Sequence, residues 1–226
     1  MKSTSIFAKI LRFLGIFFMS LTAGFTILGG AGTTCAALLP TKWESMAPLA
    51  PFQWLYILYV IVTIAIGVLG IRAVVKLVKG HKDGYKAAMI ALIAGVLVGG
   101  LHIYTSRLLR GSSMPVDAVV YTTVLTLVIF LILRIPPIWK GVDYAKAPRK
   151  EKKTSAGVSS IVVGAFCLTI QHFMASTHTW NGVNYANAYQ TTMIISAAVC
   201  AIIGIALIVP AVQAKFLLTS KPTSRN

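Results

Sequence analysis

The sequence predicts an all-α fold, namely a polytopic membrane protein built as a six-transmembrane-helix bundle with both termini in the cytoplasm. The chain is 57% hydrophobic and 12% charged, whereas soluble domains average about one quarter charged residues. Its mean hydropathy is +0.80. Its apolar residues form six runs, each long enough to cross a bilayer core of roughly 30 Å as a helix. We therefore expect one integral membrane domain over residues 1–226.

Basic, proline-rich and turn-forming segments separate the six predicted spans. The spans cover approximately residues 13–39, 52–75, 85–109, 116–135, 157–176 and 190–212. Pro40, Pro48 and Pro51 interrupt helical structure between the first two spans. A basic start followed by apolar and then small residues is also typical of a signal peptide, but we expect the first run to be retained as a span.

The positive charge is distributed unevenly along the chain. The formal net charge is +16, and all but three of the 21 Lys and Arg residues (Lys42, Arg107 and Arg110) fall on one predicted side. This positive-inside bias orients both termini, a flexible basic loop over 138–156 and a tail over 213–226 toward the cytoplasm. Because topology explains the charge, we expect no nucleic-acid partner. The expected partners are membrane lipids, since each basic residue near the surface attracts anionic headgroups by about 1 kcal/mol.

The sequence does not predict an enzyme. Cys35, Cys167 and Cys200 form no C-x-x-C pair and have no metal-ligand spacing. The chain lacks a G-x-S-x-G or H-E-x-x-H motif, a phosphate loop and an acidic catalytic pair. The span interiors also lack the Asp, Glu, Lys and Arg that proton- or ion-coupled carriers place there. Unpaired cysteines and the positive-inside bias favour a prokaryotic cytoplasmic (inner) membrane.

One stripe of small and polar residues runs along the third span. Gly95, Gly99, His102 and Ser106 are spaced i, i+4, i+7 and i+11, which places them on one helical face. Small residues let helix backbones approach closely in membranes. We therefore predict that Gly95, Gly99 and Ser106 pack against neighbouring helices.

Two histidines are candidate cofactor ligands. His102 lies fifteen residues past Ala87, and His172 lies fifteen residues past Gly157, in spans that run in the same predicted direction. Two imidazoles at one depth are able to ligate one haem b between helices. The interpretation that we favour is plainer: each imidazole hydrogen-bonds a hydroxyl or a carbonyl near the interface.

Three charged residues surround the turn between the third and fourth spans. Arg107, Arg110 and Asp117 are able to bind an anion or a lipid headgroup at the outer face. The alternative, which we favour, is an ion pair between helix ends, with the arginines near the negative end of the third span.

These observations define a class of protein without identifying its ligand. The leading hypothesis is a non-catalytic component of a membrane assembly. It would be either an accessory subunit or a protein that binds a lipid or a small apolar ligand, and its partners would be other membrane subunits. The first alternative is an electron-transfer subunit linked to haem b or quinone through His102 and His172. The second alternative is a carrier or channel for a neutral or lipid-like solute, with neutral side chains such as Thr126 and Ser196 along its path.

Overall fold

The computed structural model describes residues 5–42, 44–146, 149–180, 183–184, 187 and 190–219. Its α-helices are α1 (Ile6–Leu38), α2 (Gln53–Lys79), α3 (Gly84–Arg110), α4 (Val116–Leu133), α5 (Pro136–Val142), α6 (Arg149–His178) and α7 (Gln190–Thr219). Two 3₁₀ segments, η1 (Pro40–Lys42) and η2 (Glu44–Phe52), join α1 to α2. A two-residue antiparallel ladder of β1 (Thr179–Trp180) and β2 (Val183–Asn184) lies between α6 and α7. Apart from this ladder, the regular structure of the described residues is helical, as predicted.

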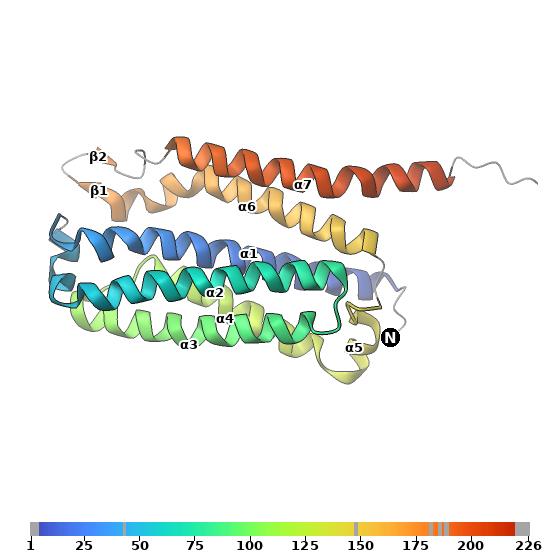
Figure 1. The fold of residues 1–226 in the computed structure, drawn as a ribbon, viewed down its shortest axis with the longest axis horizontal. Helices are drawn as coiled ribbons and strands as arrows, with labels where there is room; N and C mark the ends of the chain where they lie inside the picture. Colours follow the sequence, from blue (N-terminus) through green and yellow to red (C-terminus); the bar gives the residue numbers. More distant parts are fainter. Residues whose placement is uncertain are drawn as a thin grey trace, which may run out of the picture.

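The long helices lie side by side in two groups. Helices α1 to α4 form a bundle, and α6 and α7 pack along one side of it (Figure 1). α1 contacts α2, α4 and α6, whereas α7 packs mainly on α6. The beginning of α1, the α2–α3 turn and α5 lie at one end of the molecule, here called the basic end. The 3₁₀ segments and the α3–α4 turn lie at the opposite end, here called the η2 end.

Five helical segments are long and apolar enough to cross a membrane. They are α1, α2 together with η2, α3, α4 and Gln190–Pro210 of α7. The sixth predicted span, 157–176, lies within α6, whose first turns are charged and whose later side chains are only partly described. The chain thus has the apolar helices of an integral membrane protein. A sixth crossing and the orientation of the termini stay predictions.

Glycines determine where two of the central helices end. Gly80 follows α2 and Gly111 follows α3, with φ values of 76° and 72°. In this left-handed region a Cβ is strained, so glycine is the favoured residue after the last helical turn. Gly80 lets α2 continue to Lys79, beyond the predicted end at residue 75, before the chain reverses into α3.

The structure differs from the predicted flexible loop over 138–156 at both ends of that segment. Its first residues belong to α5, and α6 begins at Arg149. Val142 and Tyr144 are buried, at 0% and 1% exposure. Buried polar groups attach the described parts of this segment to α1.

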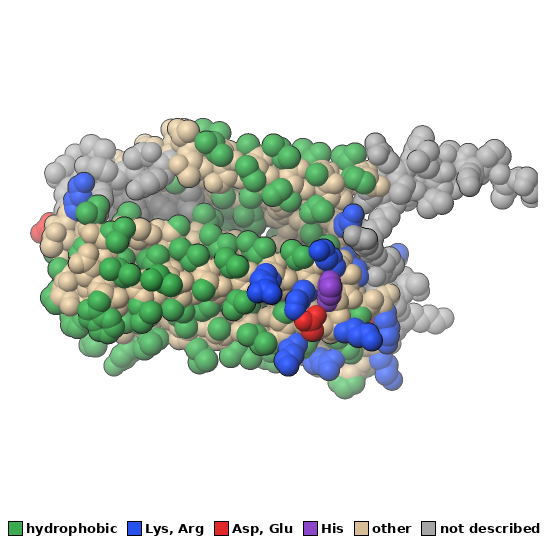
Figure 2. Space-filling view, viewed as in Figure 1, with side chains coloured by type: hydrophobic (Ala, Val, Ile, Leu, Met, Phe, Trp, Pro, Cys, Tyr) green, Lys and Arg blue, Asp and Glu red, His purple; other side chains and the backbone are tan. Residues whose placement is uncertain are grey.

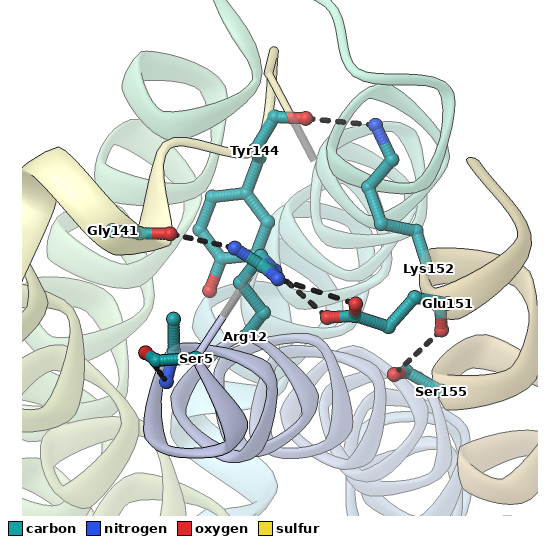
Figure 3. Close-up of polar contacts among 8 residues, drawn as sticks. Ser5, Arg12, Gly141, Tyr144, Glu151, Lys152 and Ser155 are labelled. Atoms are coloured by element: carbon teal, nitrogen blue, oxygen red, sulfur yellow. Dashed lines mark hydrogen bonds and ion pairs between the residues drawn. The ribbon is translucent and has the colours of Figure 1, made fainter. Parts of the chain in front are cut away.

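Arg12 of α1 is the centre of that attachment (Figure 3). Its guanidinium donates to both carboxylate oxygens of Glu151 and to the backbone oxygen of Gly141, at 2.8, 3.2 and 2.6 Å. Lys152 donates to the backbone oxygen of Tyr144 at 2.7 Å. A bidentate Arg–carboxylate pair is strong and directional, so it fixes α1, α5 and α6 relative to one another.

Apolar clusters lie near both ends of the interior, with buried hydroxyls between them. At the basic end, Ile16, Leu92 and Phe130 belong to one buried apolar cluster, and at the η2 end Leu49 belongs to another. Between the clusters lie buried hydroxyls, including those of Thr22, Thr26, Thr123 and Thr126. The surface shows the matching charge pattern: Lys and Arg gather at the basic end, and the face over the helices is mostly hydrophobic (Figure 2).

Candidate functional site

A cavity of about 460 Å³ opens between the helix ends at the η2 end. It is bordered by the end of α1, by η2, by the last turns of α3 and by the α3–α4 turn. Its lining residues are Gly32, Thr33, Cys35, Ala36, Glu44, Ser45, Met46, Pro48, Leu49, Tyr56, His102, Ser106, Arg110, Ser112, Met114, Pro115, Val116 and Thr179. Cavities of roughly 300–1,000 Å³ with a mainly apolar wall and a few polar groups are typical of small-molecule sites. We call this space the large cavity.

His102 is a deeply buried polar residue of the large cavity. It is 4% exposed. Its ring stacks on Tyr59, with centroids 4.3 Å apart and an interplanar angle of 12°, and it meets the edge of Tyr56 at 5.4 Å. Among the described residues, no side chain or backbone group hydrogen-bonds its ring nitrogens. The imidazole is therefore held by its ring faces, while its nitrogens stay available to a molecule in the cavity.

Two hydroxyl pairs fix the tyrosines around this imidazole. The hydroxyls of Tyr56 and Ser106 are 2.8 Å apart, and those of Tyr59 and Thr105 are 3.1 Å apart. Each pair joins α2 to α3 through buried or partly buried groups. Because buried hydroxyls are costly to leave unpaired, these bonds hold both rings against His102.

The two arginines of the α3–α4 turn have different partners. Arg107 donates to the carboxylate of Asp117 at 2.5 Å and to the hydroxyl of Ser113 at 2.9 Å. Ser113 also donates to Asp117 at 2.6 Å. Arg110 instead lines the large cavity. Its Nη2 donates to the Met114 backbone oxygen at 2.8 Å, and its buried Nε has no hydrogen-bond partner among the described residues. The turn thus contains a helix-end ion pair and a second arginine that is only partly satisfied.

A smaller cavity of about 30 Å³ lies next to the large one, toward the middle of the bundle. Thr33, His102 and Val116 line both cavities. The remaining lining residues are Thr26, Gly29, Thr63, Ile66, Gly95, Val98, Gly99, Val119, Val120 and Thr123. The predicted stripe of α3 therefore faces this interior space: Gly95 and Gly99 lie against Thr123 and Val120 of α4.

The structure does not bring the two predicted haem ligands into one site. His102 is enclosed between α2 and α3, whereas His172 is exposed on α6. α3 and α6 are not among the helix pairs that pack closely. The rings of Tyr56 and Tyr59 occupy the space beside His102 that a macrocycle would need. Haem b at these two residues stays a prediction that the geometry does not favour.

Sequence reasoning did not single out Tyr56 and Tyr59 and therefore missed their contact with His102. The signal was present, because residues three apart lie on one helical face. Glu44, Met46 and Leu49 of η2 were also missed as cavity residues, since a proline-rich connection gives no periodic pattern that predicts packing.

Comparisons with protein-family models, with curated proteins and with solved structures found no match to this chain. The site itself is therefore the basis for any functional conclusion.

Proposed function

We propose that the chain is an integral membrane protein that binds a compact ligand with an anionic group in the large cavity. The observation that carries this proposal is that two polar side chains of α3 that line the large cavity have nitrogen atoms without hydrogen-bond partners in the described part of the chain. The buried Nε of Arg110 and the ring nitrogens of the 4% exposed His102 lack protein hydrogen-bond partners among the described residues. Buried donors without partners are rare in proteins and often mark a binding site.

Arg110 favours an anion over a neutral or cationic ligand. The neighbouring Arg107 is already paired with Asp117, so its charge is compensated. A carboxylate or phosphate on the ligand would supply the acceptor that Nε of Arg110 lacks and would form a charge-assisted hydrogen bond. Glu44 also lines the cavity, but it is exposed, so water screens its charge more strongly than a charge in the interior.

The remaining walls favour a ligand with an apolar part. Ala36 and Leu49 are buried apolar residues of the lining, and Met46 is half-buried there. The volume of about 460 Å³ admits a small amphiphile rather than a complete two-chain lipid. This proposal makes the hypothesis of a membrane component that binds a lipid or a small ligand more specific, because it names a small amphiphile with an anionic group.

The charge distribution supports one orientation of the site. Because Lys and Arg gather at the basic end (Figure 2), we place that end in the cytoplasm and the large cavity at the outer surface of a prokaryotic inner membrane. The basic end would then contact anionic lipid headgroups.

Two probes with the same tail test the ligand class. Thermal unfolding of the full chain in uncharged nanodiscs is measured with n-octyl phosphate and with 1-octanol. We expect the phosphate to stabilise the protein by about 2.7 kcal/mol at a hundredfold excess over its Kd, and 1-octanol to have a much smaller effect.

A matched pair of arginine variants provides the control. Arg110→Gln should abolish the stabilisation by n-octyl phosphate, whereas Arg107→Gln, one helical turn away, should retain it. Equal stabilisation of both variants would show that the anion binds outside the large cavity, and stabilisation by 1-octanol alone would overturn the anionic class.

A further inference from the structure

We propose that the smaller cavity is the inner end of a water-accessible path, which enters the bundle through the large cavity and reaches the middle of α1 to α4. The chain would then contain half of a route for water-sized neutral solutes. Water in the smaller cavity does not require a ligand in the large one, so this proposal and the proposed function are tested separately.

The two cavities are joined at three residues. Thr33 of α1, His102 of α3 and Val116 of α4 line both spaces. His102 is the polar member of this junction that is almost fully buried, at 4% exposure. Its ring nitrogens have no hydrogen-bond partner in the described part of the chain. The junction therefore combines a narrow passage with an imidazole able to donate to and accept from water.

The smaller cavity meets the two requirements for bound water, which are room and polar partners. A water molecule needs a cavity of about 10–15 Å³, and this space is about 30 Å³. Thr26 and Thr123 donate their hydroxyl protons to the backbone oxygens of Thr22 and Val119, at 2.8 and 2.7 Å. Each hydroxyl oxygen keeps acceptor capacity toward the cavity.

The path ends before a hydroxyl–hydroxyl contact, and an apolar layer follows that contact. The hydroxyls of Thr22 and Thr126 lie 2.7 Å apart, one turn closer to the basic end than Thr26 and Thr123. Beyond them lie Ile16 and other residues of the apolar cluster at the basic end. A carrier that works by alternating access has such a closed layer on one side of its site.

Silver ion is the probe for this path, because Ag⁺ is small, enters water-filled spaces and replaces the proton of a thiol. In a chain with Cys35, Cys167 and Cys200 changed to Ala, single near-isosteric cysteines are introduced as Thr26→Cys, Thr63→Cys and Thr123→Cys. These positions come from α1, α2 and α4. Each protein is exposed to Ag⁺ in nanodiscs, and the protected thiol fraction is measured by alkylation after denaturation and mass spectrometry.

Two control positions lie on the same helices but outside the cavity. Thr22→Cys lies beyond the end of the proposed path, and Thr122→Cys lies on α4 at a partly exposed position that lines neither cavity. We expect protection at 26, 63 and 123 to be at least about tenfold faster than at 22 and 122, since the hydrocarbon core holds no water. A chain that keeps only Cys35, which lines the large cavity, is the positive control.

A blocking variant tests the direction of entry. Val116→Phe at the junction should slow protection at 26, 63 and 123 at least about tenfold, because it fills the passage, and should leave Cys35 reactive. Protection of Cys35 without protection at the three test positions would overturn the proposal. Equal protection at all positions, controls included, would overturn it as well, because water would then reach the core by general opening. Since the three test positions lie on separate helices, loss of folding in one variant leaves the others to decide.

Discussion

Arg12 forms a bidentate ion pair with Glu151, a residue 139 positions away in the sequence. The Arg12 side chain is 1% exposed and that of Glu151 is 19% exposed. Breaking a buried pair leaves an uncompensated charge and typically costs about 3–5 kcal/mol. This contact therefore contributes much of what holds α6 against α1 at the basic end.

Arg12→Ala should lower the thermal stability of the purified chain strongly, by about 3–5 kcal/mol. Lys9→Ala, an exposed basic residue one turn earlier on α1, should change it by less than about 0.5 kcal/mol. The double change Arg12→Met with Glu151→Met should be milder than Arg12→Ala, because it removes both charges. Equal effects of the first two variants would contradict a buried ion pair.

Tyr144→Phe should leave the protein as stable as before or more stable by about 1 kcal/mol. Tyr144 is 1% exposed, and its hydroxyl has no hydrogen-bond partner among the described residues. Removing an unsatisfied buried hydroxyl relieves a desolvation cost. Tyr85→Phe is the comparison, because the Tyr85 hydroxyl donates to the Phe130 backbone oxygen at 3.0 Å, and its loss should destabilise the chain in the same unfolding assay.

The same residue gives a pH dependence with a defined sign. Burial raises the pKa of Tyr144 above the ordinary value of 10.0. The unfolded chain then releases the hydroxyl proton of Tyr144 at a lower pH than the folded chain. Deprotonation of Tyr144 therefore does not affect the free energy of unfolding below about pH 10, and it lowers this free energy as the pH rises further. We expect the wild type to lose up to about 1.4 kcal/mol per pH unit more than Tyr144→Phe in this range, measured as the difference between their chemical denaturation curves. An equal loss of stability with rising pH in the wild type and in Tyr144→Phe would contradict this prediction.

Substitution by alanine at two adjacent glycines of α3 should change the stability of the chain in opposite directions. A Cβ on Gly99 would overlap Val120 of α4, whereas a Cβ on Gly100 would have no neighbour within 4 Å among the described atoms. Gly99→Ala should destabilise the chain by about 1–3 kcal/mol through overpacking. Gly100→Ala should be neutral or stabilise it by up to about 1 kcal/mol through helix propensity. Val120→Ala should rescue the first variant, and thermal unfolding of the four proteins measures all three effects.

The proposed orientation is tested with reporter fusions in a bacterial inner membrane. Green fluorescent protein fused to the C-terminus should fluoresce, and alkaline phosphatase at the same position should be inactive, because the end of α7 is placed in the cytoplasm. Fusions after Ser112, in the α3–α4 turn, should give the reverse pattern. The opposite result at both positions would place the large cavity in the cytoplasm.

Much of the helical architecture could be predicted from the sequence because the relevant signals are local. The predicted span 85–109 compares with α3 at Gly84–Arg110, and 116–135 compares with α4 at Val116–Leu133. An apolar run of about twenty residues bounded by glycine or charge defines such a helix without knowledge of its neighbours.

Close helix contacts were predicted less well. The sequence singled out the glycines of α3, but α6 and α7 also approach closely, with a Cβ on Gly157 falling 2.7 Å from the Gly204 backbone oxygen. Glycine spacing shows where a close approach is possible, and it does not show which helix is the partner.

The sequence by itself determined that this chain is apolar, helical and asymmetric in charge. Composition, helical periodicity and the order of charged segments can all be read along the chain without knowledge of tertiary contacts. Only the tertiary structure decided which polar groups meet. It buried Arg12 against Glu151, stacked His102 on Tyr59 rather than opposite His172, and paired Arg107 with Asp117 while leaving Nε of Arg110 unpartnered among the described residues. Helix order and rotation determine these choices. They bring together side chains far apart in sequence, where the cost of an unpaired buried group selects one arrangement.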